Sequence, residues 1–462
     1  MTLKVKNTLS GKKEEFKPIK DNHVGMYVCG PTVYDFGHLG HGRSAVVFDI
    51  IRKYLKYKGY DVTYVSNYTD IDDKMINRAN KEGITVKQLA EKIIPEYQED
   101  YGQLKIDKPD TQPKATQYIP QMIELIKKLI EKGYAYELED GVYYEVEKFA
   151  HYGKLSGQNQ DELKAGARIE KDDKKRHPHD FVLWKKAKPD EPSWPSPWGE
   201  GRPGWHIECS AMSMDLLGET FDIHGGGMDL IFPHHEDEIA QSEAATGKSY
   251  VKYWLHNGFI TINNEKMSKS LGNFFTLKEI FAKYNPNTVR YMIIGTHYRS
   301  PINFSHELLD QSENALSRIK DFLINLKNYK NETSKSSPAL KKTLENAIKD
   351  FEKRMDDDFD TAGGLGALYN LIKEVNILMK NGDLAETDKE KIETTLKKID
   401  SVLCILPEVE TSVNPEVENA IKARTDARKN KDFALADKIR KDLESQGIIL
   451  EDTPQGTIWK KV

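Results

Sequence analysis

Long apolar runs are missing from this sequence of 462 residues. No stretch of about 18 apolar residues is present, so we expect no transmembrane helix and no partner membrane. The first 20 residues also lack the apolar segment that a secretory signal peptide needs.

The sequence also has few cysteines and no net positive charge. The three cysteines, Cys29, Cys209 and Cys404, lie far apart and show no Cys-x-x-Cys spacing, so we expect no disulfide framework and a reduced, cytoplasmic setting. We interpret Cys404, which lies in an apolar helical stretch, as ordinary packing. The net charge of -5 argues against a protein that coats nucleic acid through a general basic surface.

The common phosphate and calcium fingerprints are missing as well. The sequence contains neither a Walker loop nor a dinucleotide-binding glycine pattern. Asp70, Asp72 and Asp73 lie close together, but the glycine and the final glutamate of a calcium loop are not there. Capping of a helix is the commoner use of such aspartates.

What is present predicts a parallel sheet. Residues 25–29 form an apolar run, residues 41–57 carry apolar side chains every four positions, and residues 62–66 alternate. This order predicts strand, helix and strand, which is the unit of a parallel sheet. Ligands of such sheets bind beyond the carboxyl ends of the strands, so we expect a site near residues 29–41 and 67–73.

The pattern of apolar and polar residues changes at about residue 113. A helical stretch at 119–132 leads into a hairpin-like run at 135–146 and a segment rich in proline and tryptophan at 189–197. We interpret residues 113–200 as an insertion, after which another strand, at 221–224, precedes a helix that we expect to begin at Pro233. Further patterns predict a hairpin at 258–264, helices across 306–406, a helix pair at 420–429 and 433–445, and strands at 448–450 and 457–459.

Four residues around the predicted mouth of the sheet have the chemistry of a zinc site. Cys29 ends a strand, Cys209 opens an apolar helix predicted at 209–217, and His234 and Glu238 are four residues apart on one helix face. Zinc binds thiolate, imidazole and carboxylate groups. Taken singly, each is more often a packed or solvent-facing side chain, and His235 is an alternative ligand.

Two further motifs suit a nucleotide. His38 and His41 lie where the first strand turns into the first helix, whose free N–H groups suit phosphate, although the two rings can equally be helix caps. Lys266 and Lys269 lie in a basic loop, 266–270, whose ammonium groups can stabilise charge on a leaving pyrophosphate. A short basic loop is otherwise a solvated turn.

Together these motifs resemble the signature pair of the class I aminoacyl-tRNA synthetases, with Leu39 where isoleucine is frequent. The segments around them narrow the resemblance to the cysteinyl-tRNA synthetases; they are residues 29–35, 67–74, 204–212, 224–230 and 232–238. The resemblance implies an α/β fold with a split, Rossmann-like parallel sheet, followed by an α-helical bundle and a small α+β module.

The resemblance also implies a division of the chain. Residues 1–112 and 201–265 are the two halves of the catalytic domain, and residues 113–200 are the insertion. Residues 266–315 hold the basic loop and a stem-contact region, residues 316–406 the bundle, and residues 407–462 an anticodon-recognition module.

The implied activity is that of a cysteine–tRNA ligase, which joins cysteine to AMP from ATP, releases pyrophosphate and transfers cysteine to the 3′ end of tRNA(Cys). One Zn²⁺ on Cys29, Cys209, His234 and Glu238 selects the thiolate, and Mg²⁺ accompanies ATP. The ATP contacts are His38, Gly40, His41, Lys266 and Lys269, of which the histidines and lysines are catalytic. Thr69, Trp205, His224 and Asp229 shape the cysteine pocket, where Asp229 can bind either the ammonium group of cysteine or a ribose hydroxyl. The protein is expected to be a monomer.

Zinc would let such an enzyme distinguish cysteine from serine, which differs from it only by oxygen in place of sulfur. An apolar pocket separates near-isosteres by only about 1–3 kcal/mol, whereas a zinc ion binds a thiolate far more strongly than a hydroxyl. Two rival hypotheses remain at this stage. One is a ligase that passes cysteine to an amino sugar, and the other is a non-catalytic, zinc-stabilised RNA-binding protein.

Overall fold

The computed structural model describes residues 2–158, 174–266, 274–331, 337–409, 415–453 and 456–461. The chain forms two compact units. The first consists of Met1–Leu309 and Lys353–Ala362, and the second of Asp310–Glu352 and Gly363–Val462. Within the described ranges, no helix is both long enough and apolar enough to cross a membrane.

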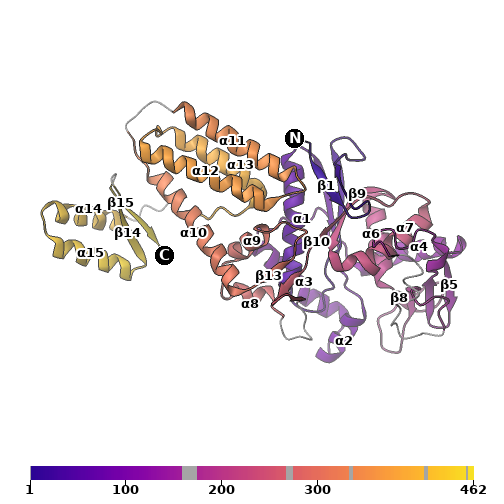
Figure 1. Ribbon diagram of the computed structural model, residues 1–462. Helices are drawn as coiled ribbons and strands as arrows, with labels where there is room; N and C mark the ends of the chain where they lie inside the picture. Colours follow the sequence, from indigo (N-terminus) through magenta and orange to yellow (C-terminus); the bar gives the residue numbers. More distant parts are fainter. Residues whose placement is uncertain are drawn as a thin grey trace. The chain divides into compact units, whose positions relative to one another are not determined.

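A four-stranded parallel sheet organises the first unit (Figure 1). Its strands are β3 (His23–Val28), β4 (Asp61–Ser66), β9 (Phe221–Gly227) and β10 (Val251–Asn257), in the order β10-β9-β3-β4. Each neighbouring pair is parallel, and β3 pairs with β9 across the middle. The predicted parallel sheet is confirmed, and its two halves come from either side of a long insertion.

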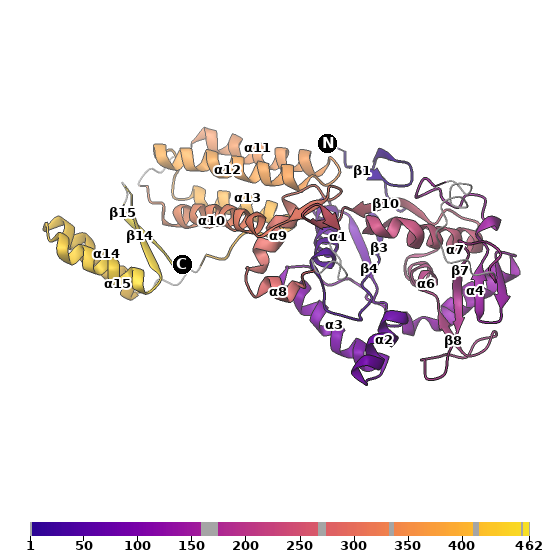
Figure 2. The same ribbon diagram turned by 60° about the horizontal axis from the view of Figure 1, so that its bottom comes forward.

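The connections of this sheet reverse direction at its centre. Helix α1 (Leu39–Tyr57) joins β3 to β4, and α7 (Glu236–Thr246) joins β9 to β10 on the other side. Because such crossovers are right-handed, steps in opposite directions place the two helices on opposite faces. Figure 2 shows α1 on one side of β3 and β4, with α7 and α6 (Trp205–Leu217) on the other. The point of reversal, between β3 and β9, is where open sheets bind ligands.

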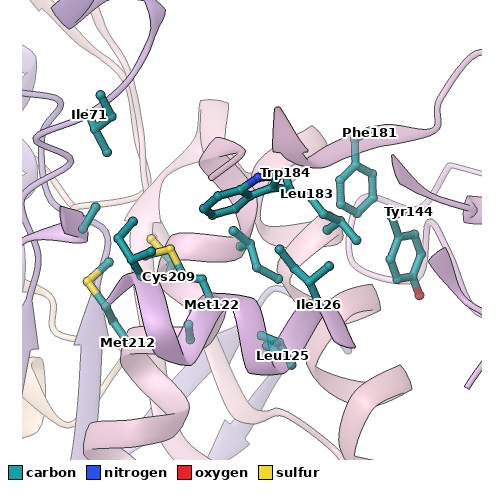
Figure 3. Close-up of a cluster of buried hydrophobic side chains, with 14 of the residues drawn as sticks. Ile71, Met122, Leu125, Ile126, Tyr144, Phe181, Leu183, Trp184, Cys209 and Met212 are labelled. Atoms are coloured by element: carbon teal, nitrogen blue, oxygen red, sulfur yellow. The ribbon is translucent and has the colours of Figure 1, made fainter. Parts of the chain in front are cut away.

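The insertion carries a sheet of its own. Strands β5 (Ala135–Leu138), β6 (Gly141–Tyr144), β7 (Phe181–Lys186) and β8 (Gly201–Pro203) are antiparallel in that order, beside α4 (Ile119–Glu131). Figure 3 shows Trp184 and Met122 of the insertion in one apolar cluster with Cys209 and Met212 of α6. Because this core is continuous, the insertion supports the helix that carries Cys209.

Several elements of the first unit were not predicted from the sequence. They are β1 (Lys4–Asn7), β2 (Lys12–Glu15), α2 (Asp73–Glu82) and α3 (Val86–Gln103). The predicted hairpin lies slightly later, as β11 (Ile260–Ile262) and β12 (Glu265–Lys266), and β11 also pairs in parallel with β13 (Ile302–Phe304). Helices α8 (Leu277–Phe281) and α9 (Pro286–Ile294) lie between them in sequence, and short helical turns occur at Ala115–Gln117, Val146–Lys148 and Met228–Leu230.

The second unit is mainly helical, as predicted. It contains most of α10 (His306–Asn328) and α11 (Pro338–Met355), with α12 (Thr361–Asn381) and α13 (Asp388–Leu403). The helix pair α14 (Pro415–Lys429) and α15 (Phe433–Ser445) and the antiparallel strands β14 (Ile448–Thr453) and β15 (Gly456–Lys461) follow. Cys404, which we expected inside a helix, caps the end of α13 with a φ of 55°.

A short segment from later in the chain, called here the return segment, completes the first unit. Residues Lys353–Ala362 belong to it although the helices on both sides belong mainly to the second unit. Asp356 accepts a hydrogen bond from the Tyr54 hydroxyl at 2.7 Å, and Asp358 accepts one from the Lys6 amide at 2.7 Å. These buried carboxylates attach the return segment to α1 and to the N-terminal hairpin.

Three predicted helix starts were wrong, and one of them is that of α14, which begins at Pro415 and not at residue 420. Helix α6 begins at Trp205 and not at Cys209, because its first turn contains polar residues that hid the apolar pattern. Helix α7 begins at Glu236 and not at Pro233. The residue before a proline is driven into extended conformations, and Phe232, with φ −137° and ψ 131°, interrupts the helical segment Ile231–His235.

Candidate metal and nucleotide site

A cavity of about 340 Å³ opens at the carboxyl ends of β3 and β9. Its lining includes Cys29, His38, His41, Trp205, Asp229 and Asn257. The loops after β3 and β4 approach each other closely here, since a Cβ atom on Gly30 would lie 1.5 Å from the carbonyl oxygen of Asn67. The predicted mouth of the sheet is therefore a real hollow at the reversal point.

The four residues predicted to hold zinc lie together beside this cavity. The ligand atoms of Cys29, Cys209, His234 and Glu238 all lie within 4.8 Å of one another. Cys29 is half-buried and lines the cavity, while the other three are buried. They come from the end of β3, from α6, from the turn before α7 and from α7 itself.

The separations within this cluster fit a tetrahedral zinc site. Around such an ion, two sulfur ligands lie about 3.8 Å apart, sulfur and oxygen about 3.6 Å, and nitrogen and oxygen about 3.4 Å. Here Cys29 Sγ is 3.6 Å from Cys209 Sγ and 3.5 Å from Glu238 Oε1. His234 Nε2 is 3.1 Å from Glu238 Oε1 but makes no hydrogen bond of acceptable geometry, although it is buried. The donor set and its spacing therefore suit the ion.

The carboxylate of Glu238 is oriented by groups behind it. Its Oε2 atom lies 2.8 Å from His224 Nε2 and accepts a hydrogen bond from the Tyr250 hydroxyl at 3.1 Å. This arrangement leaves Oε1 directed at Cys29 and His234. Partners of this kind usually orient metal ligands.

A second set shares part of this cluster. Cys29, His224, His235 and Glu238 also place their ligand atoms within 4.8 Å of one another. His235 Nε2 lies 3.3 Å from Cys29 Sγ, and its Nδ1 lies 2.8 Å from His256 Nε2. We favour the first set, because it supplies two sulfurs and leaves His224 to orient Glu238.

The charges in the cluster suit a cation. A hydrogen bond from Cys29 is the main cause that lowers the pKa of the Cys209 thiol to about 6. Burial alone would raise the pKa of Glu238, yet His224 and His234 hold it well below its usual range. For His234 burial acts in the opposite direction and would lower the pKa, but the Glu238 carboxylate raises it to about 10. The site therefore favours a thiolate and a carboxylate next to positive charge.

His38 and His41 cap α1 and line the cavity at the same time. His38 Nδ1 accepts the His41 amide hydrogen at 3.2 Å, and His41 Nδ1 accepts the His38 amide hydrogen at 3.3 Å. The two rings are stacked with centroids 3.5 Å apart. The capping alternative is thus observed, and it leaves both residues, with Gly40, on the cavity wall.

The residues predicted for the cysteine pocket divide into two pairs. Trp205 and Asp229 line the cavity, and the Trp205 ring is stacked on His234 with centroids 4.2 Å apart. Thr69 and His224 are fully buried, where Thr69 donates a hydrogen bond of 2.7 Å to Glu208 and His224 contacts Glu238. The first pair can touch a ligand in the cavity, whereas the second pair acts on neighbouring carboxylates.

The basic loop is only partly described. Lys266 ends β12, while Lys269 lies outside the described residues. The chain on both sides of the loop reaches the site: Ile260 of β11 lines the cavity, and the Phe275 carbonyl accepts the Leu39 amide hydrogen at 3.3 Å. The roles of both lysines stay predictions.

The three neighbouring aspartates have structural partners. Asp72 caps α2 by accepting the Met75 amide hydrogen at 2.8 Å, and Asp70 accepts the Thr116 amide hydrogen at 2.9 Å. Asp73 lies 3.1 Å from Lys185. One of the three aspartates thus caps a helix, and the other two have a backbone partner and a lysine partner.

Some residues of the site escaped the sequence analysis. Tyr250 directly precedes β10 and His256 lies near its end, and Tyr97 comes from α3, where its hydroxyl lies 3.2 Å from His41 Nδ1. None of them belongs to a motif. Their only sequence signal is a polar or aromatic side chain inside an apolar stretch, which more often means packing.

Comparison with known proteins agrees with this architecture. The family model described as tRNA synthetases class I (C) catalytic domain matches residues 15–314, and the DALR domain model matches residues 350–407. Methionyl-tRNA synthetase from Mycobacterium tuberculosis, solved with methionyl-adenylate, has a similar fold, with a TM-score of 0.59, 16% identity and coverage of 83% of this chain and 90% of that one. The LeuRS of the Agrobacterium radiobacter LeuRS–tRNA–LeuAMS complex also has a similar fold, with a TM-score of 0.60, 10% identity and coverage of 85% of each chain.

The fold and the catalytic domain together make this chain a class I tRNA synthetase. Two relatives identify the family within this class. A Cysteine–tRNA ligase from Thermodesulfovibrio yellowstonii is 52% identical over 99% of both chains, and one from Carboxydothermus hydrogenoformans is 50% identical over 100% of both. The chain therefore belongs to the cysteine–tRNA ligase family.

Proposed function

We propose that this protein activates cysteine with ATP and transfers it to the 3′ end of tRNA(Cys). The observation that carries the proposal is the cluster of two cysteines, a histidine and a glutamate beside the cavity at the sheet reversal, where Cys29 lines the cavity. The partners are ATP, cysteine and tRNA(Cys), and the protein works as a monomer in the cytoplasm.

In this proposal Cys29, Cys209, His234 and Glu238 hold one Zn²⁺ ion. Zinc bound there would supply a thiophilic Lewis acid that attracts a thiolate far more strongly than a hydroxyl. Since Cys29 lines the cavity, a small amino acid in the cavity can bring its side chain to this cluster. Trp205 gives it an aromatic wall, and the Asp229 carboxylate on the same wall suits its ammonium group.

ATP occupies the other side of the same cavity. His38 and His41, with the backbone at Gly40, donate hydrogen bonds to its phosphates, and Lys266 and Lys269 stabilise the charge of the departing pyrophosphate. The carboxylate of cysteine attacks the α-phosphorus, so the protein needs no covalent nucleophile and contributes position and charge. Mg²⁺ accompanies the nucleotide and has no assigned protein ligand.

The second step loads the tRNA. The final module, residues 407–462, is the part of the chain proposed to recognise the anticodon. The match of residues 350–407 to a DALR domain and the full-length match to the relatives favour tRNA over an amino sugar as acceptor.

The test combines metal analysis with two assays of the purified protein. We expect about one zinc per chain, pyrophosphate exchange that depends on cysteine, and charging of total tRNA with cysteine but not serine. Exchange without tRNA charging would indicate the amino-sugar ligase. Absence of both activities would leave only the non-catalytic RNA-binding alternative.

A further inference from the structure

The hydrogen bonds around His41 determine which of its nitrogens carries the proton. The His38 amide can only donate, and it lies 3.3 Å from His41 Nδ1. That nitrogen must therefore accept, and the ring proton of a neutral His41 sits on Nε2. Because His41 lines the cavity, its Nε2–H group is a donor suited to the proposed phosphates.

Tyr97 adds a second constraint to the same nitrogen. Its hydroxyl lies 3.2 Å from His41 Nδ1, and its ring meets the His41 ring edge-on with centroids 5.5 Å apart. Since Nδ1 is an acceptor, the phenol must be the donor in this hydrogen bond. The Tyr97 side chain is only 1% exposed, so water does not readily replace it.

The loop before the histidines is shaped to admit this tyrosine. A Cβ atom on Gly37 would lie 3.2 Å from the Tyr97 ring, which is tighter than ordinary contact. Glycine at this position lets α3 bring Tyr97 against the loop. The contact between Tyr97 and His41 is therefore held from both sides, by the buried helix and by the loop.

We infer that Tyr97 is a positioning residue that holds His41 in the orientation and tautomer that donate to ATP. The inference rests on the proposed function, because it gives His41 its task in adenylate formation. Tyr97 itself does not line the cavity and acts through the imidazole. Its hydroxyl opposes a proton on Nδ1 and thereby keeps the donor on Nε2.

The test is a double-mutant cycle measured by cysteine-dependent pyrophosphate exchange. Tyr97→Phe removes only the hydroxyl, and we expect kcat to fall about tenfold with the KM for cysteine unchanged. In a protein that already carries His41→Gln, Tyr97→Phe should change kcat by less than about twofold, because the partner is gone. An equal loss in both backgrounds, or no loss in the wild-type background, would overturn the inference.

A matched control separates positioning from stability. Tyr144 is also a buried tyrosine, and its hydroxyl donates a hydrogen bond of 2.9 Å to the Ala240 carbonyl in the apolar core. Tyr144→Phe should cost similar stability and leave kcat unchanged. If Tyr97→Phe does not fold, Tyr97→Met removes the same hydroxyl with a side chain that adapts to gaps, and the same cycle applies. Wild-type protein without exchange would refute the proposed function; active wild type with an additive cycle would refute only the role of Tyr97.

Discussion

Asp100 has a buried carboxyl group for which the described residues supply no hydrogen bond. Burial, with a smaller effect from Glu99, raises its pKa to about 7. An aspartate in the unfolded chain titrates near 3.9. Between these two values the unfolded state releases a proton that the folded state keeps, so rising pH favours unfolding. The stability associated with Asp100 is complete below about pH 4 and is lost as the pH rises through about 7.

Asp100→Asn should remove this pH dependence. We expect the wild type to lose more stability than the variant between pH 5 and pH 8, because only the wild type must bury a charge at the higher pH. Urea unfolding midpoints at the two pH values measure the difference. The same decrease in both proteins would show that Asp100 does not titrate in this range.

Cys209 is the residue whose replacement tests the selection of sulfur. Cys209→Ser removes one thiolate from the cluster, and we expect zinc affinity to fall by at least about tenfold, with a smaller preference for cysteine over serine in pyrophosphate exchange. Metal content and the ratio of kcat/KM for the two amino acids are the measurements. Cys404→Ser is the matched control, since Cys404 caps α13 in the second unit and should change neither. An unaltered preference in Cys209→Ser would contradict the zinc mechanism.

The sequence was informative where a residue has unusual chemistry for its place. Cys29, Cys209, His234 and Glu238 could be grouped because each lay near a predicted strand end or helix start, and their ligand atoms meet in the structure. Tyr97 could not be found in this way. A tyrosine on an amphipathic helix is normally a core residue, and its contact with His41 depends on how α3 packs against the loop.

At the scale of elements, Arg43 joins α1 to two later segments. This buried guanidinium donates hydrogen bonds to the carbonyl oxygens of Phe259, at 2.6 Å, and Tyr298, at 3.1 Å, and also to that of Ser300. Burial lowers its pKa to about 10, so it stays charged at neutral pH. One side chain thus connects the helix of the histidine pair to the segment that enters β11.

Arg43→Met should destabilise the protein by about 3 kcal/mol or more, since it leaves several buried carbonyls without donors. We also expect a higher KM for ATP, because Phe259 lines the cavity. Arg78→Met is the control: Arg78 pairs with Glu82 on the surface of α2, where such pairs contribute less than about 1 kcal/mol. Equal shifts in the unfolding midpoint for the two variants would contradict this role.

Periodicity predicted β3, α1 and β4 because each has an apolar face of the expected spacing. It did not predict β1 and β2, whose strands are short and rich in lysine and glutamate. The start of α7 was misplaced for a local reason, the extended residue that precedes Pro233. Boundaries depend on such details of the backbone, whereas the existence of an element depends on its buried face.

At the scale of the whole molecule, the last 50 residues have a core of their own. Val417, Leu443, Ile448 and Leu450 form an apolar cluster between α14, α15 and β14. A protein that ends at residue 409 should therefore stay folded and keep cysteine-dependent pyrophosphate exchange within about twofold. We expect its rate of charging tRNA(Cys) to fall by at least about tenfold, because the proposed anticodon contact is removed. Unimpaired charging would refute the anticodon role of residues 407–462.

The catalytic unit is not one continuous stretch of chain. It includes ten residues, Lys353–Ala362, that follow two long helices in the sequence. Three aspartates of this segment accept hydrogen bonds, one from α1, one from the N-terminal hairpin and one from Arg299. Shortening the gene from its 3′ end past this point would leave the hydroxyl of Tyr54 and the guanidinium of Arg299 without these acceptors. Anyone who wishes to produce the adenylating half alone must therefore splice residue 309 to residue 353 through a linker, because no stop codon can separate the two units.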